Sequence, residues 1–429
     1  MFRFTNLIIF RMTRDCNMSC AYCFMLDKDK YLGERLDFDL FKKIIDKIVK
    51  QRRVNNLGQQ ELSLIFHGGE PLMIGKEKFK QFLEYIRTEF NKYGLRYKLG
   101  MQSNATLLDD EFAQILNEHN MSVGLSFDGI ADANSQRTDI KQQIFEDKFE
   151  VLEKNDVNYG FLLVVGKHNI DGIKESQRYL KNLKSVNGFK ANYAEDFFNY
   201  DKKNNIELTG EEFFEKVMKS EIEEFMKSGK IYEHHTEEVL NRSVVDILTQ
   251  HGNNAKVGCG SKFCGAAISM IGVNPDGTSH YCDRYTKEFP ETFVMNNLDY
   301  DFHGIHQLKE ALNYNITRDQ VIRDTGCDTC YAQYICEGGC MAMYYSKHGE
   351  YGLDKDLVCG QYKNFYKFVL ENLEDILNSM AKFDHPIKSK DEIFNIKSNM
   401  KSFISSINLE TELDQNNKFI LKIKRRKDG

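Results

Sequence analysis

The stretch of residues 7–23 reads LIIFRMTRDCNMSCAYC and combines an apolar run with three closely spaced cysteines. Its first part is a short apolar run, which predicts a buried β-strand over Leu7–Arg11. Three cysteines follow at once, Cys16, Cys20 and Cys23, with the spacing C-x3-C-x2-C. Three thiolates in one loop can bind three irons of a [4Fe–4S] cube and leave the fourth iron open to a substrate group. A zinc site and three unrelated thiols are the alternatives.

Five further apolar runs follow, and helical patterns separate them. Phe38–Val49, for example, reads FDLFKKIIDKIV, with apolar residues at intervals of three and four. Strands that alternate with helices predict an α/β fold with a parallel sheet, here a partial (β/α)6 TIM-like barrel with its chemistry at the carboxyl ends of the strands. The other predicted strands are Leu62–His67, Tyr97–Gln102, Ser122–Phe127, Gly160–Val165 and Gly188–Tyr193.

The pattern changes along the chain and predicts three parts. The partial barrel covers residues 1–235, and charged bridge helices from about Thr209 reach about residue 255. Residues 256–380 are rich in glycine and cysteine without helix periodicity, which predicts a small ligand-stapled domain that ends in a helix over Lys363–Met380. Residues 381–429 form a C-terminal extension, in which one helix and a terminal strand at FILKIKR (419–425) are expected.

Polar residues stand where three of the predicted strands end. Residues 66–72 read FHGGEPL, residues 102–108 read QSNATLL and residues 122–129 read SVGLSFDG. Gly68 and Gly69 permit a close approach of the backbone to a ligand, and Glu70 offers a carboxylate to an ammonium group. Ordinary turns and helix caps are the alternative interpretation of these polar residues.

The chain has 11 cysteines, and eight of them lie between Cys259 and Cys359. A long segment without cysteine separates this set from the first, which a disulfide framework would not usually leave. In a reducing compartment such clusters are metal ligands more often than disulfides. Two structural zinc sites are the alternative, because zinc ribbons use similar C-x2-C pairs.

The first cysteine loop resembles the signature of the radical S-adenosylmethionine (SAM) superfamily, C-x3-C-x-aromatic-C, with Tyr22 as the aromatic residue. The resemblance covers residues from about 5 to 375. It implies a [4Fe–4S] cluster on the three cysteines, and it implies SAM, which the cluster cleaves to a 5′-deoxyadenosyl radical. FHGGEPL is similar to the family's GGE motif, so Gly68, Gly69 and Glu70 are expected at the SAM amino group. The further SAM contacts that the resemblance implies are Tyr22, Asn104, Ser126, Asp128 and Arg137.

The second cysteine set resembles the SPASM domain, a C-terminal module of radical SAM enzymes that modify peptides and proteins. The resemblance implies two auxiliary [4Fe–4S] clusters, and therefore three clusters in all. Its interleaved topology implies that one set of four cysteines holds the first auxiliary cluster and another set the second. The first set is Cys259, Cys264, Cys282 and Cys340, and the second is Cys327, Cys330, Cys336 and Cys359.

The choice of substrate depends on two features. Asp283 follows Cys282 in HYCDRY, where anaerobic sulfatase maturases, which make formylglycine from Ser or Cys, carry a functional Asp. Asp283 is therefore a candidate base, with a surface or ion-paired carboxylate as the alternative. FHGGEPL is closer to maturases of ribosomal peptides, so the first expectation is a maturase that cross-links or otherwise dehydrogenates a ribosomally made peptide. Sulfatase maturation is the second, and a non-catalytic electron carrier or scaffold is the alternative from another class.

Composition narrows the compartment and the partners. Net charge is −6 over 429 residues, which gives no footprint for nucleic acid. The sequence has no apolar run long enough for a membrane and no signal peptide, so a cytoplasmic protein is expected. The expected partners are a peptide or protein substrate and reduced flavodoxin or ferredoxin. Because Cys16 comes so early, a leader peptide would need the tail, the bridge helices or a separate leader-binding protein.

Overall fold

The structure is a computed structural model of the chain. It describes residues 5–23, 25, 33–137, 142–183, 186–194, 206–249, 264–266, 268–285, 294–295, 305–350, 352, 359–383, 409–413 and 419–423. None of the helices in these ranges is both long and apolar enough to span a membrane.

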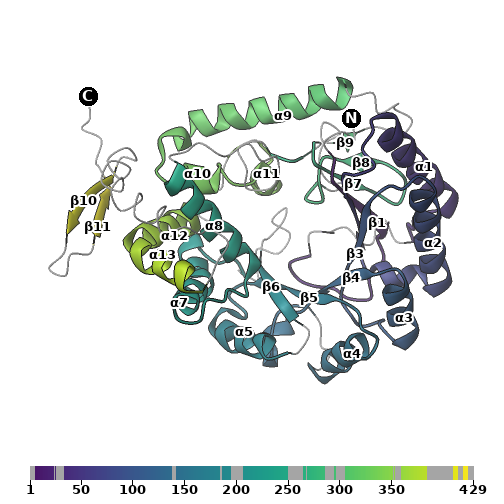
Figure 1. The fold of residues 1–429 in the computed structure, drawn as a ribbon, viewed down its shortest axis with the longest axis horizontal. Helices are drawn as coiled ribbons and strands as arrows, with labels where there is room; N and C mark the ends of the chain where they lie inside the picture. The colour runs from purple at the N-terminus through teal and green to yellow at the C-terminus, as the bar shows by residue number, and fades with distance from the viewer. Residues whose placement is uncertain are drawn as a thin grey trace.

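A curved sheet of nine strands forms the centre of the molecule (Figure 1). Its order is β6-β5-β4-β3-β2-β1-β7-β8-β9, and the pairs from β1 to β6 are all parallel. The predicted parallel α/β sheet is therefore confirmed, and each predicted strand overlaps an observed one. The six strands are β1 (Leu7–Thr13), β2 (Leu62–Gly68), β3 (Tyr97–Ser103), β4 (Met121–Ser126), β5 (Tyr159–Val165) and β6 (Val186–Tyr193).

Helices cover the outer face of this sheet and leave its inner face to the interior of the molecule (Figure 1). The first helix begins where the Asp37 side chain accepts hydrogen bonds from the backbone N–H groups of Asp39 and Leu40, a standard N-cap. Its apolar residues are buried against the sheet, and they include Phe41, which packs edge-on to Phe10 of β1. The five helices are α1 (Phe38–Val54), α2 (Lys76–Lys92), α3 (Asp110–Glu118), α4 (Gln142–Lys154) and α5 (Ile173–Lys181).

The second cysteine region adds three strands to the same sheet. β7 (Met270–Val273) pairs in parallel with β1, and β8 (Ser279–His280) and β9 (Val294–Met295) continue antiparallel. Residues more than 260 positions apart thus become neighbours, as at Leu7 and Met270. This pairing places the segment around Cys282 beside the strand that leads to Cys16.

Bridge helices follow β6, as the sequence predicts. Thr209 caps the first of them in a capping box with Glu212. The Thr209 hydroxyl accepts a hydrogen bond from the Glu212 N–H, and the Glu212 carboxylate accepts one from the Thr209 N–H. A π-helical turn, Phe214–Met218, joins the first two, and Gly229 ends the second in the left-handed conformation. The bridge helices are α6 (Gly210–Phe213), α7 (Lys219–Ser228) and α8 (His234–Thr249).

The prediction of a single helix over Lys363–Met380 is wrong in one respect, because the structure has two helices there. Asn372 leaves the helical conformation, and both its backbone N–H and its side-chain amide donate to the carbonyl of Phe368, which ends the first of these helices. The helices of this region are α9 (Ile305–Asp324), α10 (Gln333–Cys336), α11 (Met341–His348), α12 (Gly360–Glu371) and α13 (Leu373–Lys382).

Two strands lie in the C-terminal extension. The predicted terminal strand is β11 (Phe419–Ile423), and it pairs antiparallel with β10 (Leu409–Leu413), which the sequence analysis did not predict. The helix expected before them lies outside the described residues.

Candidate functional site

The cysteine loop follows β1 at the carboxyl edge of the sheet. Cys16, Cys20 and Cys23 are half-buried, and none of them is in a disulfide. The loop is fastened to the end of β3, because the Asn104 side-chain amide donates to Asn17 Oδ1 at 2.8 Å and lies 3.8 Å from Cys16 Sγ. Asn104 was expected at SAM, and the structure gives it this structural contact with the loop.

The two glycines at the end of β2, Gly68 and Gly69, hold the start of the same loop. The Gly69 N–H donates to the carbonyl of Thr13 at 2.8 Å, and the next N–H donates to the carbonyl of Asp15 at 2.8 Å. A Cβ on Gly69 would lie 2.0 Å from the Asp15 oxygen, and one on Gly68 would lie 2.3 Å from the Thr13 oxygen. The close approach expected of these glycines is therefore made to the backbone of the cysteine loop.

The Glu70 carboxylate is fully buried and joins β2 to the end of β3. It accepts hydrogen bonds from Ser103 Oγ at 2.9 Å, from the Asn104 N–H at 2.7 Å and from the Leu72 N–H at 3.2 Å. Burial raises the pKa of Glu70 to about 7, although the three hydrogen bonds oppose that shift. Its side chain thus fixes the strand ends around the cysteine loop.

A buried polar cluster joins Tyr22 of the cysteine loop to the ends of β4 and β5. Asp128 accepts a short hydrogen bond from the Tyr22 hydroxyl and another from the Val164 N–H at 2.9 Å. Arg137 Nη1 lies 3.9 Å from Asp128 Oδ1, so the structure brings three of the predicted SAM contacts together. Burial raises the pKa of Tyr22, and the Asp128 charge raises it further, so this phenol remains protonated.

His168 belongs to the same cluster, and the sequence analysis missed it. Its ring stacks on that of Tyr22 at 6.0 Å, and its Nε2 lies 3.9 Å from Asp128 Oδ2. Both ring nitrogens are buried without a hydrogen-bond partner among the described residues. Its position just after β5 repeats the polar strand-end pattern of the earlier motifs and was the available signal.

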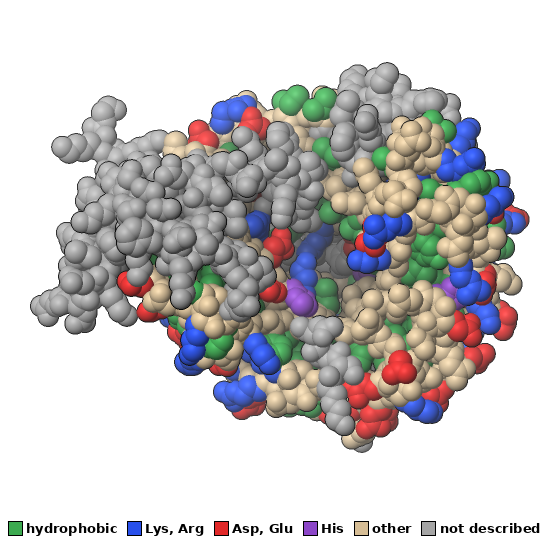
Figure 2. Space-filling view, viewed as in Figure 1, with side chains coloured by type: hydrophobic (Ala, Val, Ile, Leu, Met, Phe, Trp, Pro, Cys, Tyr) green, Lys and Arg blue, Asp and Glu red, His purple; other side chains and the backbone are tan. Residues whose placement is uncertain are grey.

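Ser126 lies at the same edge of the sheet. Its hydroxyl accepts a hydrogen bond from Gln102 Nε2 at 2.7 Å, which links the ends of β4 and β3. All the predicted strand-end residues therefore lie at the carboxyl edge. Figure 2 shows a hollow at the centre of the displayed face, and basic, acidic and histidine side chains gather in it.

Three of the cysteines expected at the first auxiliary cluster lie around two tyrosines. Cys264, Cys282 and Cys340 pack against the small core of Tyr285 and Tyr314, whose hydroxyls are 2.8 Å apart. Burial raises the pKa of Tyr314, and the charges of these cysteines raise it further. The fourth expected ligand, Cys259, lies outside the described residues.

The cysteines expected at the second auxiliary cluster also lie within electrostatic reach of one another. Burial raises the pKa of Cys336 to about 12; the N–H of Gly338 opposes the shift, and three neighbouring thiols add to it. Those thiols are Cys327, Cys330 and Cys359. These four cysteines are therefore neighbours in the structure.

The chemistry of the donors fits iron–sulfur clusters. None of the ten cysteines in the described part of the chain is in a disulfide, and thiolates are the usual ligands of such clusters. Within the described ranges, no three His, Cys, Asp or Glu side chains are arranged to hold a single metal ion.

Asp283 lies between the second cysteine region and β1. Its Oδ1 is 3.3 Å from Nη2 of Arg11, a fully buried β1 side chain whose role the sequence analysis did not anticipate. Burial would raise the pKa of Asp283, but the charges of His67, Arg11 and Arg284 lower it. Asp283 is thus an ionised carboxylate that keeps 24% of its side chain exposed.

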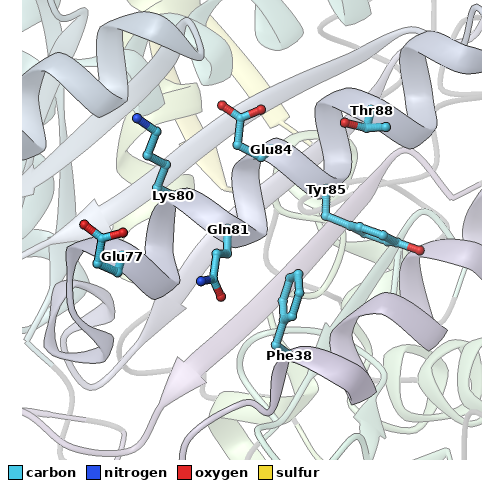
Figure 3. A pocket seen from close by; sticks show the side chains of 7 residues that line it. All are labelled: Phe38, Glu77, Lys80, Gln81, Glu84, Tyr85 and Thr88. Atoms are coloured by element: carbon cyan, nitrogen blue, oxygen red, sulfur yellow. The ribbon is translucent and has the colours of Figure 1, made fainter.

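A separate groove lies on the outer helices. Figure 3 shows its lining, which comes from the start of α1 and from one face of α2. The groove shares no residue with the cysteine loop or the strand ends. Its lining residues are Phe38, Glu77, Lys80, Gln81, Glu84, Tyr85 and Thr88.

Known proteins match this chain in sequence over nearly its whole length. A cysteine-type anaerobic sulfatase-maturating enzyme of Clostridium novyi (strain NT) is 23% identical over 400 residues, which cover 89% of this chain and 99% of the relative. A serine-type anaerobic sulfatase-maturating enzyme of Bacteroides thetaiotaomicron is 22% identical over 401 residues, which cover 85% and 90%.

Solved structures share the fold. Native anSMEcpe with bound AdoMet (SAM) and Kp18Cys peptide has a TM-score of 0.68 at 23% identity, covering 87% of this chain and 98% of that one. Streptococcus suis SuiB bound to its precursor peptide SuiA has a TM-score of 0.52 at 16% identity, covering 82% and 75%.

The family comparison agrees with the geometry of the strand ends. The model of the radical SAM superfamily matches residues 10–180, which run from β1 through the cysteine loop and into α5. These residues contain the three thiols, the Gly-Gly-Glu turn and the Asp128 cluster. Residues 10–180 are therefore a radical SAM domain, the part of the chain that the family model matches.

Proposed function

We propose that this enzyme oxidises a cysteine or serine side chain of a peptide or protein substrate to formylglycine. The observation that carries the proposal is the match to the cysteine-type sulfatase-maturating enzyme, which spans 89% of this chain and 99% of the relative. The sequence alone favoured cross-linking of a ribosomal peptide, but SuiB bound to the precursor peptide SuiA matches this chain with a lower TM-score than anSMEcpe does. The matches therefore support sulfatase-type maturation better.

The proposed cofactors are SAM and three [4Fe–4S] clusters. Cys16, Cys20 and Cys23 would hold the first. The two auxiliary clusters would use the four-cysteine sets that contain Cys264 and Cys336, as named above. When bound, these groups supply one-electron chemistry: a 5′-deoxyadenosyl radical that removes a substrate hydrogen atom, and an acceptor for the electron released later.

The strand-end residues would bind and orient SAM. The buried Asp128 cluster fixes Tyr22 beside Cys20 and Cys23, so its hydrogen bonds determine the shape of the loop on which SAM would lie. Arg137 and Ser126 offer donors for the SAM carboxylate, and His168 adds a polar ring to the same cluster. We include His168 among the proposed positioning residues for this reason.

Asp283 would act as the base. After the substrate carbon has lost a hydrogen atom, its side chain must still lose one electron and one proton to form a carbon–oxygen or carbon–sulfur double bond. The Asp283 carboxylate is ionised and can accept that proton. A serine thereby gives the aldehyde directly, and a cysteine gives a thioaldehyde that water converts to the aldehyde with release of hydrogen sulfide.

The test uses the reduced, cluster-loaded protein with SAM and two peptides that differ only in a central cysteine or serine. We expect an aldehyde in at least one peptide, detected by mass spectrometry and hydrazide capture, and none in the matched alanine peptide. Formation of 5′-deoxyadenosine without aldehyde from either peptide would refute the proposed substrate class. A protein that cleaves no SAM would instead support the non-catalytic alternative. Reduced flavodoxin or ferredoxin is the proposed electron donor.

A further inference from the structure

We propose that Arg11 is a positioning residue that holds Asp283, and the loop that carries it, against β1 in the geometry that proton transfer requires. This inference rests on the proposed function of Asp283. Arg11 is a fully buried side chain in the middle of β1, and nothing in its local sequence marks it as functional.

The contacts of Arg11 reach across 272 residues of sequence to the second cysteine region. Nη2 donates to the backbone carbonyl of Asp283 at 2.5 Å, to its Oδ1 at 3.3 Å and to the carbonyl of Tyr285 at 3.0 Å. Nη1 donates to Asn274 Oδ1 at 2.9 Å, at the end of β7. One guanidinium thus contacts Asn274 through Nη1 and Asp283 through Nη2 at the same time, which the planar fork of arginine permits and the single ammonium group of a lysine does not.

The opposite charges of Arg11 and Asp283 favour this pairing. A buried guanidinium is costly unless hydrogen bonds and a countercharge accompany it. Asp283 supplies a countercharge to Arg11, and yet its side chain remains 24% exposed. The carboxylate is therefore held in place and still reachable from outside.

The position of Arg11 connects the two halves of the proposed chemistry. It lies five residues before Cys16 on the strand that leads into the first cysteine loop, and its partner Asp283 directly follows Cys282. A single side chain thus ties the segment of the radical-generating site to the segment of the proposed base. Because a misplacement of about 1 Å can cost ~10²-fold in rate, the yield of product should depend on this contact.

The first test measures product formed per 5′-deoxyadenosine, a ratio that does not depend on the amount of folded enzyme. In the cluster-loaded chain, Arg11→Met should lower this ratio by about 10- to 100-fold while SAM cleavage continues. The ratio for Arg11→Lys should lie between those of wild type and Arg11→Met, because lysine keeps the positive charge and lacks the planar guanidinium fork. It also serves as the folded variant where Arg11→Met fails to fold.

Arg52 provides the matched control. It is a buried arginine of α1 that donates to the backbone carbonyls of Leu57 and Gln60, remote in sequence from both cysteine regions. Arg52→Met should reduce stability and leave the ratio unchanged. If Arg52→Met lowers the ratio as Arg11→Met does, the effect is general to buried arginines and the proposal is wrong.

A double variant separates positioning from a general defect. If Arg11 acts through Asp283, then Arg11→Met combined with Asp283→Asn should give the same ratio as Asp283→Asn alone. Effects that multiply in the double variant would show that Arg11 acts elsewhere and would overturn the inference.

Hydrogen exchange gives a readout that needs no substrate. Amides of residues 279–285 should exchange faster in the Arg11 variants than in wild type and should be unchanged in Arg52→Met. If wild type makes no aldehyde from either peptide but exchange rises as expected, the proposed function fails while the tether of the Asp283 loop stands. Unchanged exchange in both Arg11 variants would overturn the tether itself.

Discussion

Single buried side chains hold the strand ends and the cysteine loop together at the carboxyl edge of the sheet. Asp128 is fully buried, and it accepts hydrogen bonds from the cysteine loop and from β5 at once. Glu70 does the same for β2 and β3. A buried carboxylate without its partners is expensive, so a change in either residue should affect both the fold and the site.

Asp283 gives the most direct test of the proposed base. Asp283→Asn removes the proton acceptor with little change of shape, so product per 5′-deoxyadenosine should fall by about 10²-fold or more. SAM cleavage should be largely retained. Mass spectrometry of the peptide product, with wild type and variant in parallel, measures this. Asp276→Asn, which changes an exposed carboxylate in the turn between β7 and β8, is the control. Equal product from wild type and the Asp283 variant would remove Asp283 from the mechanism.

The raised pKa of Glu70 predicts that the stability of the folded chain depends on pH. Its pKa is raised from 4.5 to about 7 in the folded chain, so the folded state binds the proton more tightly than the unfolded state. The contribution of Glu70 to the free energy of unfolding therefore falls as pH rises from about 4.5 to 7, by roughly 2–3 kcal/mol across that window. Glu70→Gln should remove this slope from the free energy of unfolding, measured by denaturant titration of the cluster-free protein. Identical slopes in both proteins would contradict the raised pKa.

At the scale of elements, the contact between the Gly-Gly turn and the end of β1 sets the position of the cysteine loop. Two backbone hydrogen bonds, to Thr13 and Asp15, hold these segments together with no room for a Cβ. The turn therefore acts as part of the sheet edge as well as a place for a ligand.

Gly69→Ala tests this contact. The added methyl group would lie 2.0 Å from the Asp15 carbonyl oxygen, so one backbone must shift. We expect a loss of about 1–3 kcal/mol in the free energy of unfolding, together with weaker SAM binding measured by equilibrium dialysis. Gly172→Ala is the control, because no atom lies within 4 Å of its Cβ position. Equal stability of the two variants would contradict the close packing.

At the scale of the whole molecule, one sheet joins the radical SAM domain to the second cysteine region. β7 extends the parallel sheet from β1, and Arg11 adds side-chain bonds across the same junction. The two cysteine sets nevertheless lie on separate segments, so the clusters of one should form without those of the other.

Iron content tests this separation. Three cubes require about 12 irons per chain, and replacing Cys16, Cys20 and Cys23 together by alanine should leave about eight and abolish 5′-deoxyadenosine formation. Metal analysis of anaerobically purified protein measures the first quantity, and chromatography of the reaction measures the second. About four irons and two zincs in the wild type would refute the auxiliary clusters. A triple variant that still cleaves SAM would refute the assignment of the triad.

Local sequence patterns were enough to predict much of the fold and of the candidate site. Apolar runs and helical periodicity were enough to predict six parallel strands, and the cysteine loop was enough to show a resemblance to the radical SAM superfamily, because such signals lie within a few residues of one another. Only the tertiary structure decided the pairing of β7 with β1, the bonds of Arg11 to the Asp283 loop and the place of His168 beside Asp128. These are contacts between polar or backbone groups far apart in sequence, and each depends on burial that no local pattern records.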